Sequence, residues 1–147
     1  MNSTPRFTLV SAVHLFLLRE DQILLSRRFQ TGYQDGNYSL PAGHVDADES
    51  CLQALIRETR EEIGLQLSAE NLHFAHVIHR YEDRESLDFF FTCDNWSGET
   101  QNMEPHKCDQ LLWTPIQQLP ENVVPYVKHA ITQYLQGQKY SELGFKK

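Results

Sequence analysis

Hydrophobic residues near the start of the chain are broken by a polar turn in a way that predicts a β-hairpin. Residues 7–18 are β-branched, aromatic or rich in leucine, and Arg19–Asp21 separates them from a second apolar segment at residues 22–26. Short apolar runs on either side of a polar turn are typical of paired strands. Residues 28–37 are rich in Gly, Gln, Asn and Asp, and this composition predicts an exposed loop.

A helical period follows in residues 46–64, where apolar side chains recur at separations of three and four. The predicted buried stripe consists of Leu52, Leu55, Ile56, Thr59 and Ile63. We expect the helix to begin near residues 46–49, with Asp46 or Asp48 as the N-cap, because early acidic residues suit the positive end of the helix dipole. Gly64 is the expected C-cap, since glycine readily adopts the left-handed conformation.

The second half of the chain continues with three strand patterns and one helix pattern. Residues 72–78, 87–92 and 110–113 have the composition of strands, and residues 123–135 have that of a closing helix. Strands mixed with two helices predict an α/β fold with a mixed sheet between helices. The length of 147 residues fits one domain, residues 1–147.

Charge and composition narrow the class of protein. A net charge of -7 argues against binding to a nucleic-acid polymer, which requires clustered Lys and Arg. No apolar stretch approaches the roughly 20 residues that cross a bilayer, so we expect no membrane association. The three cysteines show no paired motif, which favours a reducing cytoplasm over a disulfide framework.

Three glutamates on the predicted helix are the first chemical signal. Glu58, Glu61 and Glu62 are separated by three and four residues, so a helix places them on one side. Two carboxylates about 6 Å apart repel each other by roughly 3 kcal/mol at an effective dielectric of 20. A divalent cation such as Mg²⁺ reverses that repulsion. The triplet alone is better explained by a solvated helix face with Arg57 and Arg60 interleaved.

The surrounding sequence decides between these interpretations. Residues 43–65, GHVDADESCLQALIRETREEIGL, carry Gly43, then Glu49 six residues later, then Arg57 eight residues after that, followed without a gap by the glutamates. This segment resembles the Nudix box, G-x5-E-x7-R-E-U-x-E-E-x-G-U, at every fixed position. Thr59 alone departs, because it stands where a bulky aliphatic residue is usual. A match of this length is far more specific than a short motif.

The resemblance implies a fold, a cofactor and a set of ligands. The fold is an α/β/α sandwich with a mixed sheet between helices, in which the box binds Mg²⁺ or Mn²⁺ and a diphosphate. Glu58 and Glu62 are the implied direct metal ligands. Glu61 is implied as a further ligand or as a holder of water, and the Gly43 carbonyl as an additional oxygen donor.

A loop beyond the box is similar to the corresponding loop of the MutT branch of this family. Residues 96–99 (WSGE) are followed by Glu104, eight residues after the Trp. In that branch a loop glutamate contributes to metal binding or catalysis, and Glu104 is the candidate for this role here. Glu99 competes for the same role, and an exposed loop glutamate is the ordinary alternative for either residue.

The implied reaction is attack by water on one phosphorus of a P–O–P linkage, assisted by the bound metal ion. A glutamate must take the proton from the water. Glu58, Glu61 and Glu104 are all candidates for this base. Glu49 and Arg57 are expected to form an ion pair that aims the metal-binding carboxylates.

Substrate contacts are predicted less specifically than the metal site. Arg27 and Arg28 are candidates to hold phosphates, although arginines often only solvate a strand end. Aromatic residues that could stack on a base, or simply pack, are Phe29, Tyr33, Tyr38 and Tyr126. Asn122 is a candidate to contact a base edge or to cap the last helix.

Three further residues have ordinary structural explanations. His14 lies in a predicted strand and is expected to be a core histidine with its hydrogen bonds satisfied. His44 follows Gly43 and is expected near the site, although no motif position requires it. Cys51 is expected to be a buried thiol of the helix.

The resemblance to the MutT branch implies a small-molecule substrate, and the expected one is a nucleoside triphosphate or a related nucleoside diphosphate derivative. The alternatives are ADP-ribose or another nucleotide sugar and, in a different class, a module that binds a nucleotide without hydrolysing it. The sequence is compatible with a monomer or a homodimer.

Overall fold

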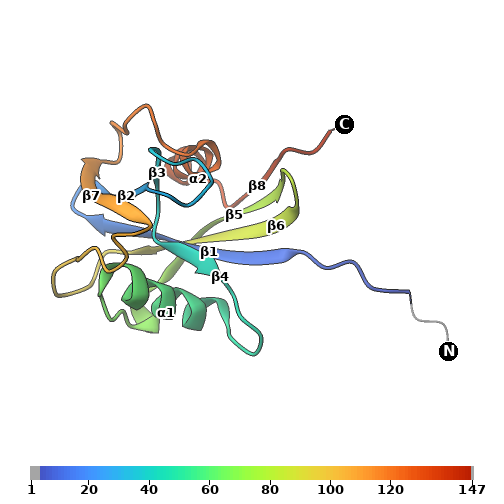
Figure 1. The fold of residues 1–147 in the computed structure, drawn as a ribbon, viewed down its shortest axis with the longest axis horizontal. Helices are drawn as coiled ribbons and strands as arrows, with labels where there is room; N and C mark the ends of the chain where they lie inside the picture. The colour runs from blue at the N-terminus through green and yellow to red at the C-terminus, as the bar shows by residue number, and fades with distance from the viewer. Residues whose placement is uncertain (1–3, 147) are drawn as a thin grey trace.

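A mixed sheet of eight strands lies between two α-helices in the computed structural model, which describes residues 4–146 (Figure 1). The ends of the predicted domain, residues 1–3 and 147, lie outside the described residues. The strands are β1 (Val10–Arg19), β2 (Gln22–Arg28), β3 (Tyr38–Ser39), β4 (Ala42–His44), β5 (His73–Tyr81), β6 (Glu85–Cys93), β7 (Cys108–Pro115) and β8 (Tyr140–Leu143). The helices are α1 (Cys51–Ile63), the short 3-10 helix η1 (Ala69–Asn71) and α2 (Pro125–Leu135).

The strand order is β3-β2-β1-β6-β5-β8, with β4 paired to β1 and β7 paired to β2. The pairs β1–β6 and β5–β8 are parallel, and the other pairs are antiparallel. Helix α1 covers one face and α2 the other (Figure 1). The prediction of an α/β fold with a mixed sheet between helices is therefore confirmed.

Strand β1 organises the sheet because it pairs with three neighbours. Its end forms the predicted hairpin with β2, with Leu18 opposite Ile23. Its middle pairs with β4, where Val13 lies opposite Gly43, and its length pairs with β6. This arrangement fixes the glycine of the box against the centre of the sheet.

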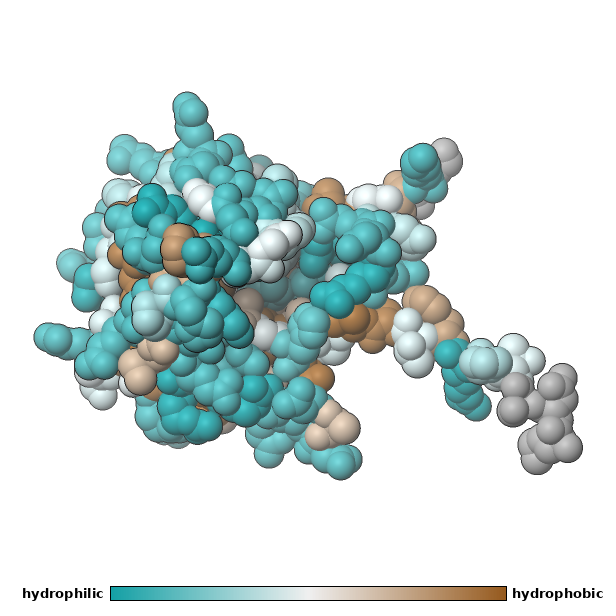
Figure 2. All heavy atoms as spheres, viewed as in Figure 1, coloured by the Kyte–Doolittle hydropathy of each residue, from teal (hydrophilic) through white to brown (hydrophobic). Residues whose placement is uncertain are grey.

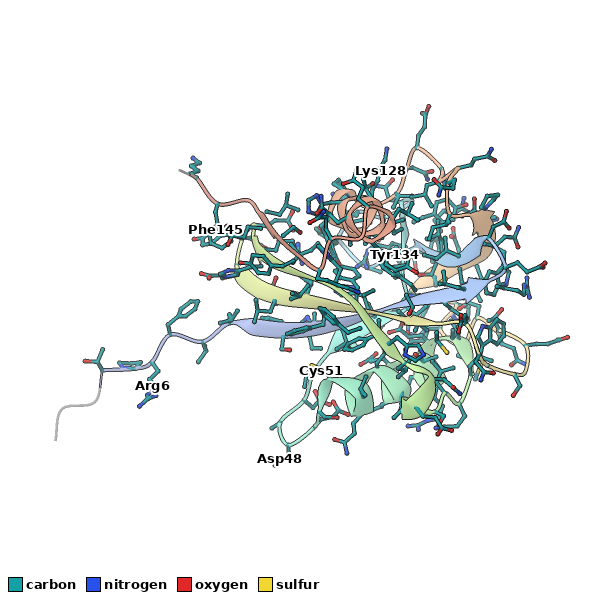
Figure 3. All side chains as sticks on the ribbon, turned by 180° about the vertical axis from the view of Figure 1, so that it is seen from behind. Arg6, Asp48, Cys51, Lys128, Tyr134 and Phe145 are labelled. Atoms are coloured by element: carbon teal, nitrogen blue, oxygen red, sulfur yellow. The ribbon has the colours of Figure 1, made fainter. Side chains whose placement is uncertain are left out.

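The start of helix α1 corrects the sequence prediction. Neither Asp46 nor Asp48 caps the helix; Ser50 is the N-cap, and its side chain accepts a hydrogen bond from the backbone of Gln53 (3.1 Å). The Gln53 side chain accepts in return from the Ser50 N–H (2.8 Å), which completes a capping box. Asp48 lies in the preceding loop with a positive φ of 64°, ahead of the first helical residue, Cys51 (Figure 3).

The end of α1 agrees with the prediction. Gly64 is the C-cap, with φ 75° in the left-handed region, and its N–H donates to the Arg60 carbonyl (3.1 Å). Of the predicted buried stripe, Leu55, Thr59 and Ile63 are buried. Leu52 and Ile56 are partly buried against the same core.

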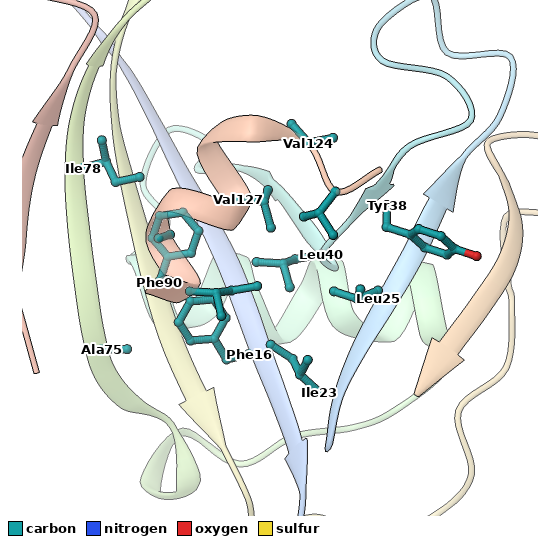
Figure 4. Packing of buried hydrophobic residues seen from close by; sticks show 13 residues of the cluster. Phe16, Ile23, Leu25, Tyr38, Leu40, Ala75, Ile78, Phe90, Val124 and Val127 are labelled. Atoms are coloured by element: carbon teal, nitrogen blue, oxygen red, sulfur yellow. The ribbon is translucent and has the colours of Figure 1, made fainter. Parts of the chain in front are cut away.

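Two hydrophobic cores hold the layers together, one on each face of the sheet. The core beneath α2 includes Phe16, Leu25, Leu40, Phe90 and Val127 (Figure 4). The core beneath α1 includes Val13, Leu15, Leu17, Leu55 and Ile63. Alternate residues of β1 contribute to opposite cores, because successive side chains of a strand point to opposite faces.

The remaining elements lie within a few residues of their predicted positions. The strands predicted at 72–78, 87–92 and 110–113 are β5, β6 and β7, each extended at one or both ends. Helix α2 begins at Pro125 rather than at residue 123, and the short strands β3, β4 and β8 were not predicted. Asn122 does not cap α2, because Val124 is the N-cap and no side chain bonds there.

The exterior is mostly polar on the face drawn in Figure 2. Phe7, 68% exposed, precedes β1 in the extended N-terminal segment. Between residues 4 and 146, neither helix has both the length and the apolar character needed to pass through a bilayer.

Candidate active site

A cleft of about 750 Å³ lies between the glutamate face of α1, strand β4 and the segment that precedes β7. Acidic side chains from three segments line it. These are Asp46, Glu58, Glu61, Glu62 and Glu104. The four glutamates of the predicted metal site therefore share one cavity with Gly43.

Arg57 forms the centre of the hydrogen-bond network beside the cleft. Its Nε and Nη2 donate to the two carboxylate oxygens of Glu49 (2.8 and 3.0 Å), so the predicted ion pair is present in bidentate form. Its Nη1 donates to Glu58 (2.7 Å) and Glu61 (3.3 Å), and its Nη2 also contacts the His44 carbonyl (3.2 Å). One guanidinium thus ties α1 to β4 and contacts three of the cleft carboxylates, those of Glu58, Glu61 and Asp46 (3.3 Å).

Glu49 supports this network from outside the walls of the cleft. Its carboxylate also accepts the backbone N–H of Asp46 (3.0 Å). The hydrogen bonds from Arg57, and then that from Asp46, lower the pKa of Glu49 to about 2. Glu49 is therefore ionised at neutral pH and holds Arg57 in place.

Glu62 has a different environment, because it is turned inward. Its Oε1 accepts the backbone N–H of Ala42 in β4 (3.1 Å). Burial is the largest cause that raises the pKa of Glu62 well above its ordinary value, and interactions with Glu58 and Glu104 raise it further. A carboxyl crowded by two others in a poorly solvated position is stabilised by a cation.

Residues 94–107, between β6 and β7, are anchored to the end of helix α1. The Gln101 N–H donates to the Ile63 carbonyl (2.9 Å), and the Met103 N–H donates to the Glu62 carbonyl (3.0 Å). These bonds satisfy carbonyls that the helix end leaves free. They also place the following residue, Glu104, in the cleft beside Glu62.

Asn102 fixes the local conformation around Glu104. Its Oδ1 accepts the Glu104 N–H (3.1 Å), and its Nδ2 donates to the Cys108 carbonyl at the start of β7 (2.6 Å). Glu104 therefore lines the cleft, whereas Glu99, its competitor in the sequence, is not among the residues that line it. This placement favours Glu104 as the loop glutamate of the site.

Whether these carboxylates fit a metal ion depends on the contacts of Arg57. Within residues 4–146, no three His, Cys, Asp or Glu side chains are arranged so that they could hold a metal ion. Glu58 and Glu61 are instead turned toward Arg57. The donor set is nevertheless the one that Mg²⁺ prefers, because four carboxylates and a backbone segment line a single polar cleft. The residues fit a divalent cation once Glu58 and Glu61 turn from Arg57 into the cleft.

Basic side chains also line the cleft. Arg27 makes a bidentate ion pair with Asp109 (2.7 and 3.1 Å), and Arg28 donates to the Tyr33 carbonyl (2.6 Å). Both arginines and Lys107 line the cavity. The cleft thus combines carboxylates with basic side chains, which suits an anionic ligand that is bound together with a metal ion.

Comparison with known proteins places this geometry in a family. Residues 8–134 match the family model described as the NUDIX domain. The chain belongs to the NUDIX family. The sequence-based identification of a Nudix-type pyrophosphohydrolase of the MutT-like branch is thereby confirmed.

The similarity extends to curated NUDIX proteins and to solved structures. The 8-oxo-dGTP diphosphatase of Escherichia coli (strain K12) is 26% identical over 93 residues, which cover 63% of this chain and 71% of that protein. The CTP pyrophosphohydrolase of the same organism is 38% identical over 58 residues, or 40% and 43% of the two chains. A MutT NUDIX hydrolase from Burkholderia pseudomallei has the same fold, with TM-score 0.79, 24% identity and coverage of 86% and 98%.

The NUDIX glycine at position 43 leaves room for the side chain of Glu58. A Cβ on Gly43 would overlap the carboxyl carbon of Glu58 at far less than contact distance. Gly43→Ala is expected to push Glu58 away from the cleft and to lower kcat/KM about tenfold, as loss of metal-site support commonly does. Steady-state kinetics measures the loss, and an unchanged thermal unfolding midpoint shows that the fold is kept. Full activity in this variant would contradict the close packing of Gly43 and Glu58.

The other predicted contact residues lie in different places. Tyr38 is 8% exposed in the core, its hydroxyl donates to Gln110 (2.5 Å), and it is not a cleft residue. The Asn122 amide donates to the Gly36 carbonyl (2.8 Å), also outside the cleft. Phe29 is likewise absent from the wall, whereas Tyr126 lines it. Arg27 and Arg28 therefore line the cleft at the NUDIX box, whereas Tyr38 and Asn122 lie outside it.

Sequence reasoning missed three residues that line the NUDIX cleft just after Glu104. These are His106, Lys107 and Cys108. The backbone N–H groups of Lys107 and Cys108 both donate to the Glu104 carbonyl (2.9 and 3.0 Å), which turns the chain back into the cavity. The sequence signal that could have identified Lys107 as a cleft residue was its position three residues after Glu104.

Proposed function

We propose that this chain hydrolyses the diphosphate linkage of a nucleoside triphosphate, or of a related nucleoside diphosphate derivative, with Mg²⁺ or Mn²⁺ as cofactor. The observation that carries the proposal is the convergence of Glu58, Glu61, Glu62 and Glu104 on a cleft that Arg27, Arg28 and Lys107 also line. A structural role alone would leave Glu62 and Glu104 without a compensating cation, since Arg57 contacts only Glu58 and Glu61 among the four.

The cleft glutamates divide into proposed direct metal ligands and further oxygen donors. Glu58 and Glu62 are the proposed direct ligands, with Glu61, Glu104 and the Gly43 carbonyl as further oxygen donors. The metal ion, when bound, supplies charge neutralisation at the phosphates and lowers the pKa of a bound water. One of the cleft carboxylates would accept the proton of the attacking water, and Glu58, Glu61 and Glu104 are the candidates for this base.

The basic side chains of the cleft are proposed to bind the phosphates of the substrate. Arg27 is held rigidly by Asp109, so its guanidinium is oriented before a ligand arrives. Arg28 and Lys107 line the same cavity. Because the chain carries a net charge of -7, these cations and the metal ion are required to offset repulsion of an anionic substrate.

The substrate class rests on the MutT-like relatives, which are named for 8-oxo-dGTP and CTP. We therefore place nucleoside triphosphates first and ADP-ribose or nucleotide sugars second. The free thiols of Cys51, Cys93 and Cys108 support action in a reducing cytoplasm.

The test is a panel of substrates with the purified chain. Nucleoside triphosphates, ADP-ribose, nucleotide sugars and dinucleoside polyphosphates are each incubated with Mg²⁺, with Mn²⁺ and without metal, and products are identified by mass. We expect turnover of a nucleoside triphosphate that disappears without metal. Reaction in H₂¹⁸O, with label found in a phosphate product, identifies the phosphorus that water attacks.

Each alternative predicts a different result in this panel. Preferred turnover of ADP-ribose or a nucleotide sugar would replace the first substrate class by the second. Nucleotide binding without turnover of any compound, with either metal, would contradict the enzyme and support a binding module.

A further inference from the structure

Strand β8 is a short strand at the edge of the sheet, beside β5 (Figure 1). The two strands are parallel and pair over four positions, from Val77 opposite Tyr140 to Arg80 opposite Leu143. The Val77 N–H also donates to the carbonyl of Lys139, just before β8 (2.9 Å). An edge strand of this length makes few backbone hydrogen bonds, so its docking depends strongly on side-chain contacts.

Two histidines and one serine join β8 to both elements beside it. His76 of β5 and His129 of α2 each place Nε2 close to Ser141 Oγ of β8, at 2.8 and 2.9 Å. His76 is fully buried, and its Nδ1 lies 2.8 Å from the Gln138 carbonyl. The two histidine rings are 6.4 Å apart. These three side chains, called the histidine cluster below, do not line the cleft.

The Gln138 carbonyl sets the direction of the hydrogen bonds in the cluster. A carbonyl oxygen only accepts, so His76 Nδ1 carries a hydrogen. Nε2 of a neutral His76 then accepts the Ser141 hydroxyl, and the Ser141 oxygen accepts in turn from His129 Nε2. All three contacts are therefore hydrogen bonds when both rings are neutral.

One added proton leaves the cluster intact. The proton can occupy His129 Nδ1, which takes part in none of the three contacts. A proton on His76 Nε2 is also compatible, because Ser141 can then donate to a His129 ring whose own hydrogen has moved to Nδ1. Each contact keeps one hydrogen in either case.

A second proton disrupts the cluster. Both Nε2 atoms then carry a hydrogen and point it at Ser141 Oγ, so the hydroxyl hydrogen has no acceptor among the three side chains. Two positive charges also face each other across one oxygen atom, in surroundings that disfavour charge. In agreement with this, burial and then the charge of His76 lower the pKa of His129.

The strands packed against the cluster have no free negative charge on this side of the sheet. Arg80 of β5 and Asp88 of β6 form an ion pair (2.9 Å), and Arg80 lies over Tyr126 of α2. Asp88 also contacts Nε2 of the buried His14 of β1 (2.9 Å). His14 Nδ1 has no partner, so the prediction of a core histidine with its hydrogen bonds satisfied holds for only one nitrogen. Asp88 is thus already engaged by two basic groups.

Helix α2 and strand β8 do not offset a charge on the histidines either. Helix α2 contains no carboxylate, and its titratable side chains besides His129 are Tyr126, Lys128 and Tyr134. Glu142 follows Ser141 in β8 and therefore points to the opposite face of the sheet, where Tyr140 donates to it. A doubly protonated cluster thus carries uncompensated positive charge.

We propose that the histidine cluster is a pH-sensitive fastening of strand β8, which holds the strand while the two rings carry at most one added proton and releases it when both are protonated. The released strand binds protons on both rings freely, so it takes up more protons than the docked strand. Docking is therefore strongest above about pH 6.5, the ordinary histidine value, and weakens as the pH falls below it. Release leaves the edge of β5 unpaired.

Hydrogen exchange of the full chain measures the opening of β8 directly. Protection factors, corrected for the pH dependence of intrinsic exchange, are compared at pH 7.5 and pH 5.0. We expect the protection of the Val77 amide and of the β8 amides to fall about tenfold or more at pH 5.0, since each proton bound only by the open state lowers it by up to about tenfold per pH unit. The amides of Leu15 and Leu17, in the buried part of β1, are the internal reference and should change by less than about threefold.

The substitution His129→Gln removes the second titrating ring but keeps a partner for Ser141. A glutamine amide both donates and accepts, so it can bond the Ser141 hydroxyl whether or not His76 is protonated. The protection of β8 should then differ by less than about threefold between the two pH values.

Two histidine substitutions are matched controls for His129→Gln. His73→Gln changes an exposed histidine on the same strand as His76. His79→Gln removes the histidine that packs on Phe145, beyond β8 (ring centroids 4.6 Å apart). Both variants should keep the fall in protection of the wild type.

The wild-type comparison alone decides the inference if a variant does not fold. Equal changes in β8 and β1 between the two pH values would overturn it, as would a pH dependence that survives in His129→Gln or disappears in His79→Gln. The inference is independent of the proposed function, because exchange is measured without nucleotide or metal ion. Since the cluster does not line the cleft, turnover in His129→Gln should match the wild type.

Discussion

Glu62→Gln is expected to abolish turnover and to stabilise the metal-free protein at the same time. Glu62 is crowded by Glu58 and Glu104 in a poorly solvated position, which raises its pKa. Glutamine removes this repulsion and keeps an oxygen that can accept the Ala42 N–H. It also removes a proposed metal ligand, and we expect kcat/KM to fall about a thousandfold, as loss of a strong electrostatic contribution to phosphoryl chemistry does.

Two measurements check this prediction at pH 8, where a larger fraction of Glu62 is ionised than at neutral pH. Thermal unfolding without metal should show a midpoint about 3 °C higher than wild type, which corresponds to about 1 kcal/mol of relieved repulsion in a chain of this size. Addition of Mg²⁺ should raise the midpoint of the wild type, because a ligand that binds only the folded state stabilises it. The variant should show little or no such increase.

The control for Glu62→Gln is Glu99→Gln, which removes an equal charge from an exposed residue outside the cleft. It should leave both turnover and the response to Mg²⁺ near wild type. If Glu62→Gln retained more than a tenth of wild-type activity, Glu62 would not be a ligand of the essential metal ion.

Arg57→Lys is expected to lower kcat about a hundredfold although the positive charge is kept. The guanidinium of Arg57 binds Glu49 in bidentate form and contacts Glu58, Glu61 and the His44 carbonyl. A lysine ammonium is a single point charge and cannot reproduce this planar set of contacts. The carboxylates would then lose their orientation, and losses of 10- to 100-fold are typical when such support is removed.

The kinetic pattern distinguishes positioning from substrate binding. Arg57 is not among the residues that line the cleft, so kcat should fall while KM for the nucleotide changes by less than about threefold. The concentration of Mg²⁺ for half-maximal activity should increase. Arg60→Lys, an exposed position on the same helix, is the matched control and should behave as wild type. An Arg57→Lys enzyme with unchanged kcat and Mg²⁺ dependence would refute the positioning role.

Local sequence patterns were sufficient for the main elements and for the acidic face of the site. The period of three and four predicted α1 and its C-cap at Gly64, because both depend on neighbouring residues. The start of α1 was predicted too early, since several residues in 46–50 are good N-caps and only the capping box between Ser50 and Gln53 selects one of them. Strands β3 and β4 have two and three residues, too few for a hydrophobic period.

Contacts between distant residues were not predictable in this way. His14 meets Asp88 because β1 and β6 are parallel neighbours, with Ala12 opposite Asp88 in the register. Arg27 meets Asp109 through the pairing of β2 with β7. A single sequence does not specify strand partners at separations of 74 and 82 residues, so the His14–Asp88 contact and the orientation of Arg27 required the structure.

The backbone bonds from Gln101 and Met103 to the end of α1 have a consequence for local unfolding. Their acceptors are the carbonyls of Ile63 and Glu62, in the last turn of the helix. Fraying of that turn therefore also releases the segment that carries Glu104, because the same hydrogen bonds must break. We therefore expect Glu62 and Glu104 to leave the cleft together when the helix end opens, and hydrogen exchange should show similar protection for the amides of Gln101 and Met103 and for the last turn of α1.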